Sequence, residues 1–241
     1  MQSATPLWGW TSLHSAAAAS VSSLIWCTMI FWVYSETEGN TCAGARVGAA
    51  MHFFSHDLFE GCKYNAHLAK TAEKTFQVRS ANMSCILFSV SAIEAKLNEL
   101  ITMFGSISDC SNVWSDVHTN HQRKPTAQKW NLITAKTNGT DWDHSKEPFR
   151  SYNLIKALRN ELVHYKGELL EQDVAPNIKI QEIMTKLGVQ SEATFMEDDC
   201  SSWANDLLNN RELGTFVVQS ISPVWENMLH FLGSEEPATE S

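Results

Sequence analysis

Short motifs that would assign a function directly are missing from this sequence. It has no G-x-x-x-x-G-K-[ST], G-x-G-x-x-G, G-x-S-x-G or H-E-x-x-H string, which excludes the commonest nucleotide-binding, hydrolase and metalloprotease classes. Its six cysteines form no C-x-x-C pair and no short regular spacing, which argues against a zinc ribbon, a redox motif or a dense disulfide scaffold. We therefore expect reduced, mostly buried thiols, with no metal site and no cofactor.

Glycine and proline are scarce too, at 11 and 6 of 241 residues, and only 19% of the residues are charged. These fractions, with 44% hydrophobic residues, exclude collagen, a coiled-coil rod and a disordered chain, while the length suits one large domain or two small ones. Apolar residues recur three and four positions apart, and no stretch longer than five residues alternates with period two. The sequence therefore predicts an all-α fold packed as a helical bundle.

The helices are placed by this apolar spacing together with proline and turn signals. The most regular stretch has Ile86, Val90, Ile93, Leu97, Leu100 and Phe104 at steps of four and three, which predicts one buried helix face. Asn138-Gly139 predicts a turn, and Pro148 suits the first turn of a helix. The predicted helices cover about residues 58–76, 86–104, 125–133, 148–170, 178–187, 203–208 and 216–232, with Pro223 as a kink or break in the last.

The first fifty residues differ from the rest of the chain. The segment 16–34 carries no charge and approaches membrane-spanning length, but no Lys or Arg precedes it. It is either a membrane helix or an apolar helix packed on the domain or on a partner, and residues 1–50 need not belong to the working domain. We expect an N-terminal extension over 1–50, a helical domain over 51–233 and a disordered tail over 234–241, in a cytoplasmic protein for which membrane attachment through 16–34 stays open.

Charge is distributed unevenly along the chain. The net charge of −9 should repel nucleic acid and anionic membranes from the molecule as a whole. Residues 121–166, however, hold nine Lys and Arg against four Asp and Glu, a charge of +5, so the remaining residues carry −14. This basic segment is where a phosphate ligand is expected, unless it is simply a solvated helix face.

The predicted helix 148–170 lies inside the basic segment and has two distinct faces. On a helical wheel, Arg159, Asn160 and His164 point away from its apolar stripe, and Val163 lies among them. A polar face with an apolar residue in its middle is typical of a helix that meets another protein surface as well as solvent. The apolar stripe, which we expect to face the core, consists of Leu154, Ile155, Leu158, Leu162, Tyr165 and Leu169.

Two stretches resemble a known superfamily. Leu158-Arg159-Asn160-Glu161-Leu162-Val163-His164-Tyr165 resembles the R-x4-H signature of the HEPN superfamily, in which Asn commonly follows the Arg. Residues 91–100, SAIEAKLNEL, are similar to the earlier HEPN helix that carries a polar residue facing the motif helix. The resemblance covers about residues 57–233. It implies an all-α, HEPN-like helical bundle, here with an additional N-terminal apolar helix and C-terminal helices.

The same resemblance implies a function and roles for the motif residues. Many HEPN proteins are metal-independent endoribonucleases of toxin, defence or RNA-processing systems, and they form homodimers whose two motif helices face each other. In that scheme His164 is the acid and base, since an imidazole can exchange a proton near neutral pH. Arg159 holds the phosphate oxygens, and Asn160 orients the imidazole or bonds the phosphate.

Other residues would support this centre. Glu94 could anchor Arg159 or bias His164, and Asn98 could do the same. The candidates for contact with single-stranded RNA are Arg150, Lys156 and Lys166, and an antitoxin or another protein is a further expected partner.

Two alternatives stay open beside the ribonuclease. The first is a non-catalytic helical module for dimerisation or interaction, associated with a membrane through 16–34 in one version. The second is a metal site at His52 and His56 or at His118 and His121, whose spacings suit a metal but which have no third ligand nearby in the sequence.

Overall fold

The structure is a computed structural model that describes residues 52–106, 112–165, 176–191, 195–196 and 199–233. The chain divides into two units, Met1–His52 and Phe53–Ser241, and the helices below lie in the second. The predicted apolar helix at 16–34, the tail at 234–241 and Lys166 lie outside the described residues. Within the described part, no helix is both long enough and apolar enough to cross a lipid bilayer.

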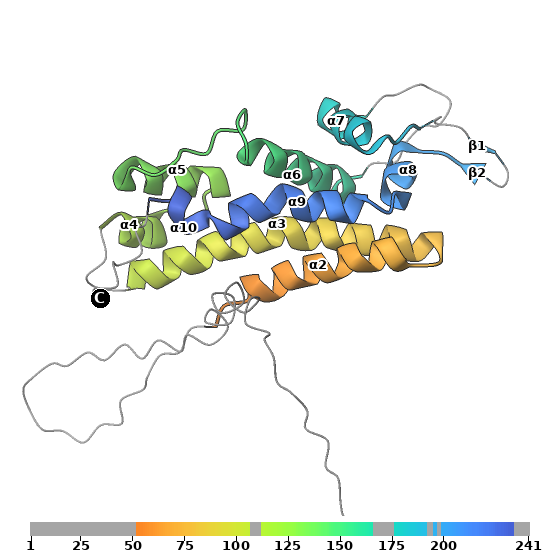
Figure 1. Ribbon diagram of the computed structural model, residues 1–241. Helices are drawn as coiled ribbons and strands as arrows, with labels where there is room; N and C mark the ends of the chain where they lie inside the picture. The colour runs from red at the N-terminus through yellow and green to blue at the C-terminus, as the bar shows by residue number, and fades with distance from the viewer. Residues whose placement is uncertain (1–51, 107–111, 166–175, 192–194, 197–198, 234–241) are drawn as a thin grey trace, which may run out of the picture. The chain divides into compact units, whose positions relative to one another are not determined.

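The described part of the chain is helical, which confirms the predicted all-α class (Figure 1). The exception is a short antiparallel pair, in which Phe195 lies opposite Cys200 and Met196 opposite Asp199. The elements are α2 Ser55–Thr71, α3 Thr75–Ser106, α4 Asn112–Asn120, α5 Thr126–Thr137, α6 Phe149–Val163, α7 Ile178–Leu187, β1 Phe195–Met196, β2 Asp199–Cys200, α8 Trp203–Asn209, α9 Leu213–Glu226 and α10 Met228–Phe231.

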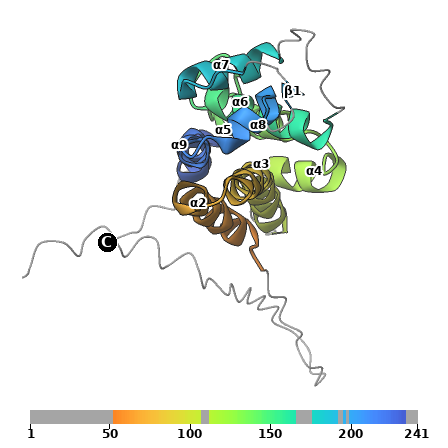
Figure 2. The ribbon, with the colours of Figure 1, turned by 90° about the vertical axis from the view of Figure 1, so that its right-hand side faces the viewer.

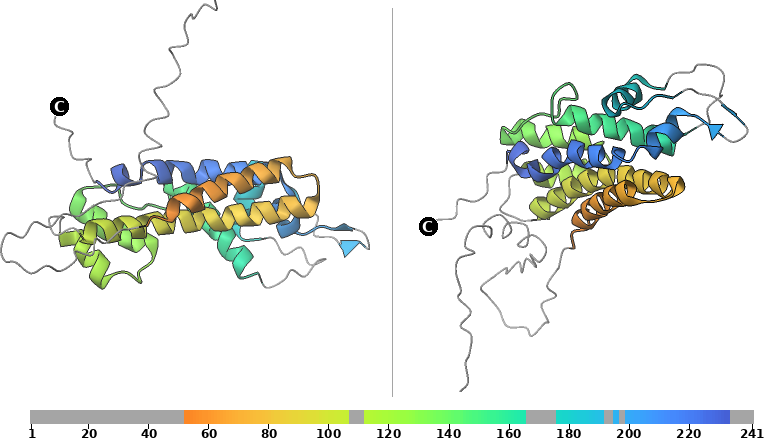
Figure 3. Two further views of the ribbon diagram at one scale, coloured as in Figure 1. Left: turned by 90° about the horizontal axis from the view of Figure 1, so that it is seen from below. Right: turned by 45° about the vertical axis from the view of Figure 1, so that its right-hand side comes forward.

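The long helix α3 is the centre of the bundle. It packs against α2, α4, α5, α6, α8 and α9, and α9 also contacts α2 and α6. Figure 2 shows the helices end-on, with α9 lying over α2 and α3, and Figure 3 shows α2 and α3 side by side. In Figure 1 the colours show that α3 and α6 run in opposite directions. The inner side of the motif helix α6 therefore packs against both α3 and α9.

The predicted apolar face of α3 forms the middle of the core. Ile86, Val90, Ile93, Leu97 and Leu100 are all at most 4% exposed, as the spacing predicts, and each contributes about 1.5–3 kcal/mol of burial free energy. The helix begins eleven residues before Ile86, at Thr75.

An aromatic cluster fixes the start of α6. Trp130 of α5 meets Trp142 and Phe149 edge-on, with ring centroids 5.1 and 5.3 Å apart, and Trp142 meets Tyr152 in the same way at 5.2 Å. The indole Nε1–H of Trp130 donates a hydrogen bond to the Thr140 carbonyl at 2.8 Å. This cluster ties the first two turns of α6 to α5 and to the loop between them.

Several predicted boundaries are wrong. The predicted helix 58–76 is divided between α2 and α3, because the chain leaves the helix at Ala72, which is extended, and re-enters it at Thr75. Helix α4 was not predicted. Pro223 lies inside α9, and the break comes at Asn227, whose backbone N–H and side-chain amide both donate to the Pro223 carbonyl.

The predicted helix 148–170 also differs from the structure, since α6 ends at Val163. Asp143 and Ser145 lie just before the predicted start and are hydrogen-bonded to each other, since the backbone N–H and the hydroxyl of Ser145 both donate to Asp143 Oδ1. It is Glu147 that supplies the carboxylate for the first turn, accepting from the Ser151 backbone N–H at 3.2 Å.

Lys96 gives the fold a testable pH dependence. Its ammonium lies over the Trp225 ring at 4.3 Å and donates to the Trp225 carbonyl at 2.6 Å. Burial lowers the pKa of Lys96 to about 8, although Glu226 and Glu99 act to raise it. The unfolded chain therefore binds a proton that the folded chain releases between about pH 8 and the ordinary lysine pKa near 10.4.

We expect the free energy of unfolding of the wild type to rise by up to about 3 kcal/mol across that window, relative to Lys96→Met, in which no charge is buried at any pH. Urea unfolding of both proteins at intervals from pH 7 to pH 10.5 measures the difference. A constant difference between the two proteins over this range would show that the pKa of Lys96 is not lowered.

Candidate functional site

The motif lies at the carboxyl-terminal end of α6. The preceding apolar residues Leu154, Ile155 and Leu158 are buried as predicted. Their burial fixes which face of α6 points to the core and which points outward. His164 is the first residue beyond the helix, and its backbone N–H donates to the Asn160 carbonyl at 3.0 Å.

Tyr165 does not face the core as predicted. It is 44% exposed, and its ring meets Trp203 edge-on at 6.0 Å. The prediction failed because it continued the helical phase beyond Val163, where α6 ends. Leu162 is only partly buried, and Leu169 lies outside the described residues.

Arg159 is anchored by Glu94. The guanidinium Nη2 lies 3.5 Å from Glu94 Oε1, and the two side chains are 26% and 35% exposed. Of the two roles predicted for Glu94, anchoring Arg159 or biasing His164, the ion pair corresponds to the first. A guanidinium has five N–H donors, and one such contact leaves most of them available for a ligand. Because the pair is only partly open to water, its geometry is better fixed than that of an exposed ion pair.

Asn98, one turn further along α3, has a different partner. Its side-chain oxygen accepts a hydrogen bond from the ammonium of Lys129 on α5. Lys129 is only 5% exposed. Burial lowers the pKa of Lys129, and the nearby charge of Glu94 acts against this. The charge of Glu94 thus acts on two cations, Arg159 and Lys129.

Tyr152 adds a buried hydroxyl to the polar cluster of Glu94, Asn98, Lys129 and Arg159. Its side chain is fully buried, and its hydroxyl has no hydrogen-bond partner. Burial raises the pKa of Tyr152, as does the charge of Glu94, while Arg159 acts to lower it. A buried hydroxyl without a partner costs about 1–3 kcal/mol. Tyr152 thus places an unused donor close to the Glu94–Arg159 pair.

The outward face of α6 is open to solvent. Asn160 and His164 are exposed, and Val163 is 52% exposed. The side chains of Asn160 and His164 make no hydrogen bond to each other, so the predicted orienting role of Asn160 stays a prediction. Lys156, one turn before Asn160, shares this face.

Of the other predicted RNA-contacting residues, Arg150 lies ten residues before Asn160, about 15 Å away along the axis of α6. Its Nη2 is 2.7 Å from Glu182 Oε1 on α7, and Glu182 also pairs with Lys186. Lys166 lies outside the described residues.

Lys129 and Tyr152 were not predicted as members of this cluster. The signal for Lys129 was present, because Thr126, Lys129, Trp130, Ile133 and Thr134 form the buried stripe of α5. A lysine inside a buried stripe needs hydrogen-bond partners. Tyr152 had no comparable signal, since a tyrosine on an apolar face is ordinary core.

The histidines of the second predicted pair, His118 and His121, have other neighbours. His121 Nε2 lies 3.5 Å from Asp116 Oδ2, and His118 lines a pocket described below. Over the described residues, no three His, Cys, Asp or Glu side chains gather as metal ligands would. Of the cysteines, Cys62 and Cys85 are buried free thiols, with their sulfur atoms 3.5 Å apart.

Comparison of the chain with protein families, with curated proteins and with solved structures found no match. The chemistry available at the end of α6 is that of its own residues. An anchored guanidinium can hold an anion, and the nitrogen atoms of an exposed imidazole five residues later can take part in proton transfer.

Proposed function

We propose that this protein is a HEPN-like, metal-independent endoribonuclease of the toxin or defence type, acting on single-stranded RNA in the cytoplasm. The observation that supports it is the motif face of α6, in which Glu94 anchors Arg159 while Asn160 and His164 are exposed. Anchoring the cation and exposing the imidazole are what phosphoryl transfer needs, because such catalysis is mostly positioning and charge stabilisation.

The reaction is an internal transfer of the phosphoryl group. The 2′-oxygen of the RNA attacks the adjacent phosphorus, the bond from phosphorus to the 5′-oxygen breaks, and the products are a 2′,3′-cyclic phosphate and a free 5′-hydroxyl. A neutral imidazole accepts the proton of the 2′-hydroxyl, and a protonated one donates to the leaving 5′-oxygen. Arg159 neutralises the charge that develops on the phosphate oxygens.

A homodimer would bring two such faces together. In the proposed dimer, Val163 of each copy lies at the contact between the two motif helices, and Arg159 and His164 border a shared cleft. The 52% exposure of Val163 supports this, because an apolar side chain in a polar face is typical of a protein contact.

The experiment is RNA cleavage by the purified protein in the presence of EDTA. We expect fragments that carry 2′,3′-cyclic phosphate and 5′-hydroxyl ends, identified by mass spectrometry. Fragments with 5′-phosphate ends would contradict the internal transfer, because hydrolysis by water and not attack by the 2′-oxygen leaves such ends, and no cleavage at any protein concentration would remove the ribonuclease proposal.

The second candidate is a non-catalytic module whose motif face binds a second copy, an antitoxin or another partner. The observation that favours it is the exposure of large apolar side chains, Val163 and Tyr165 on or beside α6 and, two and three helical turns before Glu94 on α3, Leu87 and Met83. Under this function, Arg159→Ala changes association, and RNA is not cleaved. Membrane attachment through 16–34 belongs to this second candidate.

A further inference from the structure

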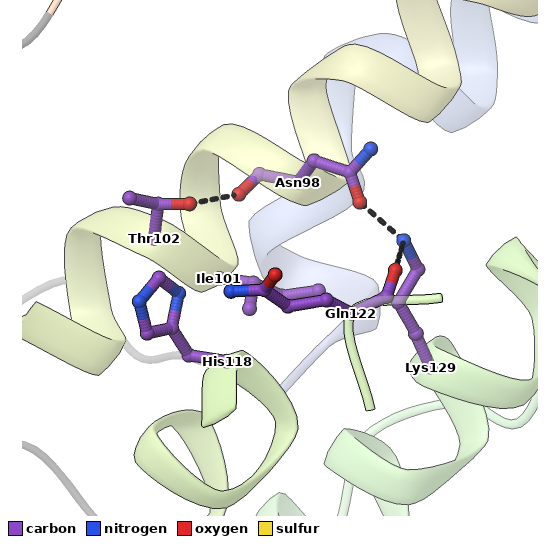
Figure 4. A pocket seen from close by; sticks show the side chains of 6 residues that line it. All are labelled: Asn98, Ile101, Thr102, His118, Gln122 and Lys129. Atoms are coloured by element: carbon purple, nitrogen blue, oxygen red, sulfur yellow. Dashed lines mark hydrogen bonds between the residues drawn. The ribbon is translucent and has the colours of Figure 1, made fainter. Parts of the chain in front are cut away.

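A pocket lies next to the motif cluster, between α3, α4 and α5. It has a volume of about 290 Å³ and is lined by Asn98, Ile101, Thr102, His118, Gln122 and Lys129 (Figure 4). Asn98 is four residues after Glu94 on α3, which is about one helical turn or 6 Å. The pocket is therefore close to the polar cluster that anchors Arg159.

Lys129 supplies a buried cation at the edge of the pocket. Its ammonium donates to the side-chain oxygen of Asn98 and to the Gln122 carbonyl, at 3.5 Å for the latter, as the dashed lines in Figure 4 show. An ammonium has three N–H groups, so one donor remains beyond these two bonds.

The charge balance of the cluster favours an anion. Glu94 pairs with Arg159, whereas the Lys129 ammonium bonds only the neutral oxygens of Asn98 and Gln122 and forms no ion pair with a described carboxylate, which leaves its positive charge unpaired. None of the six residues lining the pocket carries a carboxylate. A partly buried positive charge without a full counter-charge is stabilised by a bound anion.

The remaining wall offers neutral hydrogen-bonding groups. Figure 4 shows the Gln122 amide, the His118 imidazole and the Thr102 hydroxyl around the space, together with the apolar side chain of Ile101. The Thr102 hydroxyl donates to the Asn98 carbonyl at 2.9 Å. Amide and imidazole N–H groups are donors that suit phosphate oxygens, and the volume admits a phosphate with part of its sugar.

We propose that this pocket binds a phosphate group of the RNA strand adjacent to the phosphate held at Arg159. This inference rests on the proposed function, and it adds a second anchoring point that fixes the direction of the strand across α6 and α3. Lys129 and Gln122 are then binding residues, whereas Arg159 and His164 act on the scissile phosphate.

The test measures binding without cleavage. A fluorescein-labelled 2′-O-methyl RNA octamer cannot be cut, because its 2′-oxygen has no proton to lose, and its fluorescence anisotropy reports binding over a range of salt concentrations. We compare the wild type with Lys129→Met and, as a matched control, Lys74→Met, which removes a lysine from the exposed turn between α2 and α3. Thermal melting of each protein confirms that it is folded.

We expect Lys129→Met to weaken octamer binding about tenfold and to reduce the slope of log K against log salt by about 0.7, the value for one phosphate contact on a single strand. Lys74→Met should change neither. Gln122→Glu is the second variant, since it keeps the backbone carbonyl that Lys129 uses and places a negative charge on the pocket wall. It should weaken binding by a similar factor even if Lys129→Met does not fold.

Two outcomes overturn the proposal. One is a salt slope equal to that of the wild type in every folded variant, which makes Lys129 a structural residue only. The other is Lys129-dependent binding of inorganic phosphate or AMP, followed by ³¹P NMR, without any effect on the octamer, which makes the pocket a site for a small anion. Cleavage of ordinary RNA is assayed in parallel. A protein that binds the octamer through Lys129 but cleaves no RNA would contradict the proposed ribonuclease activity, while the proposal of a phosphate-binding pocket would still hold.

Discussion

Replacement of His164 by alanine is expected to lower the rate of RNA cleavage by about 10²–10⁴-fold, the usual contribution of a positioned general acid or base. The side chain is exposed and follows the last residue of α6, so its removal should change the free energy of unfolding by no more than about 0.5 kcal/mol. Single-turnover cleavage of a labelled RNA measures the first quantity, and urea unfolding measures the second.

The matched control is His67→Ala, which removes an exposed imidazole from α2. Its cleavage rate should equal that of the wild type. Equal rates in His164→Ala and the wild type would mean that His164 is a surface histidine and that cleavage has another source.

The largest expected effect on stability is that of Trp130→Ala. The side chain is fully buried, and its loss removes two edge-on ring contacts of the aromatic cluster together with the bond to the Thr140 carbonyl. Replacing a buried Trp with Ala costs about 3–5 kcal/mol, which for a chain of this size lowers Tm by on the order of 10 °C. Differential scanning calorimetry measures the change.

Two variants separate packing from other effects. Trp130→Phe keeps an aromatic ring and loses the indole N–H, so it should cost less than Trp130→Ala. Phe76→Ala removes an exposed ring from the first turn of α3 and should change the stability by less than about 0.5 kcal/mol. A loss in Phe76→Ala as large as that in Trp130→Ala would contradict the position of Trp130 in the core.

The middle of the helices could be predicted from the sequence, but several of their ends could not. The buried face of α3 follows from local spacing alone, since Ile86 to Leu100 repeat at three and four. The end of α6 at Val163 has no such local signal, because the apolar pattern continues to Leu169. Extending the phase past Val163 is what misplaced Tyr165.

The site residues, like the helices, could be predicted only in part from the sequence. Asn160 could be placed on the outward face because three buried residues before it set the phase of α6. Arg159, which the same phase placed there too, is instead partly buried against Glu94 of α3. The open alternatives were that Glu94 anchors Arg159, that it biases His164, or that Asn98 takes either role. Only the packing of α3 on α6 shows that Glu94 pairs with Arg159, while Asn98 bonds Lys129. Arg150 is held by Glu182 from α7, a contact between distant parts of the chain that the spacing of charges does not reveal.

The central claim is that the exposed face of α6 meets the same face of a second copy. Its most direct test is the molar mass in solution of the wild type and of Val163→Glu, by sedimentation equilibrium, with Tyr64→Glu on the exposed face of α2 as the control. We predict a mass about twice the 27.0 kDa of one chain for the wild type and the control, and the mass of one chain, with loss of RNA cleavage, for Val163→Glu. A Val163→Glu protein with the mass and the cleavage rate of the wild type would contradict the claim.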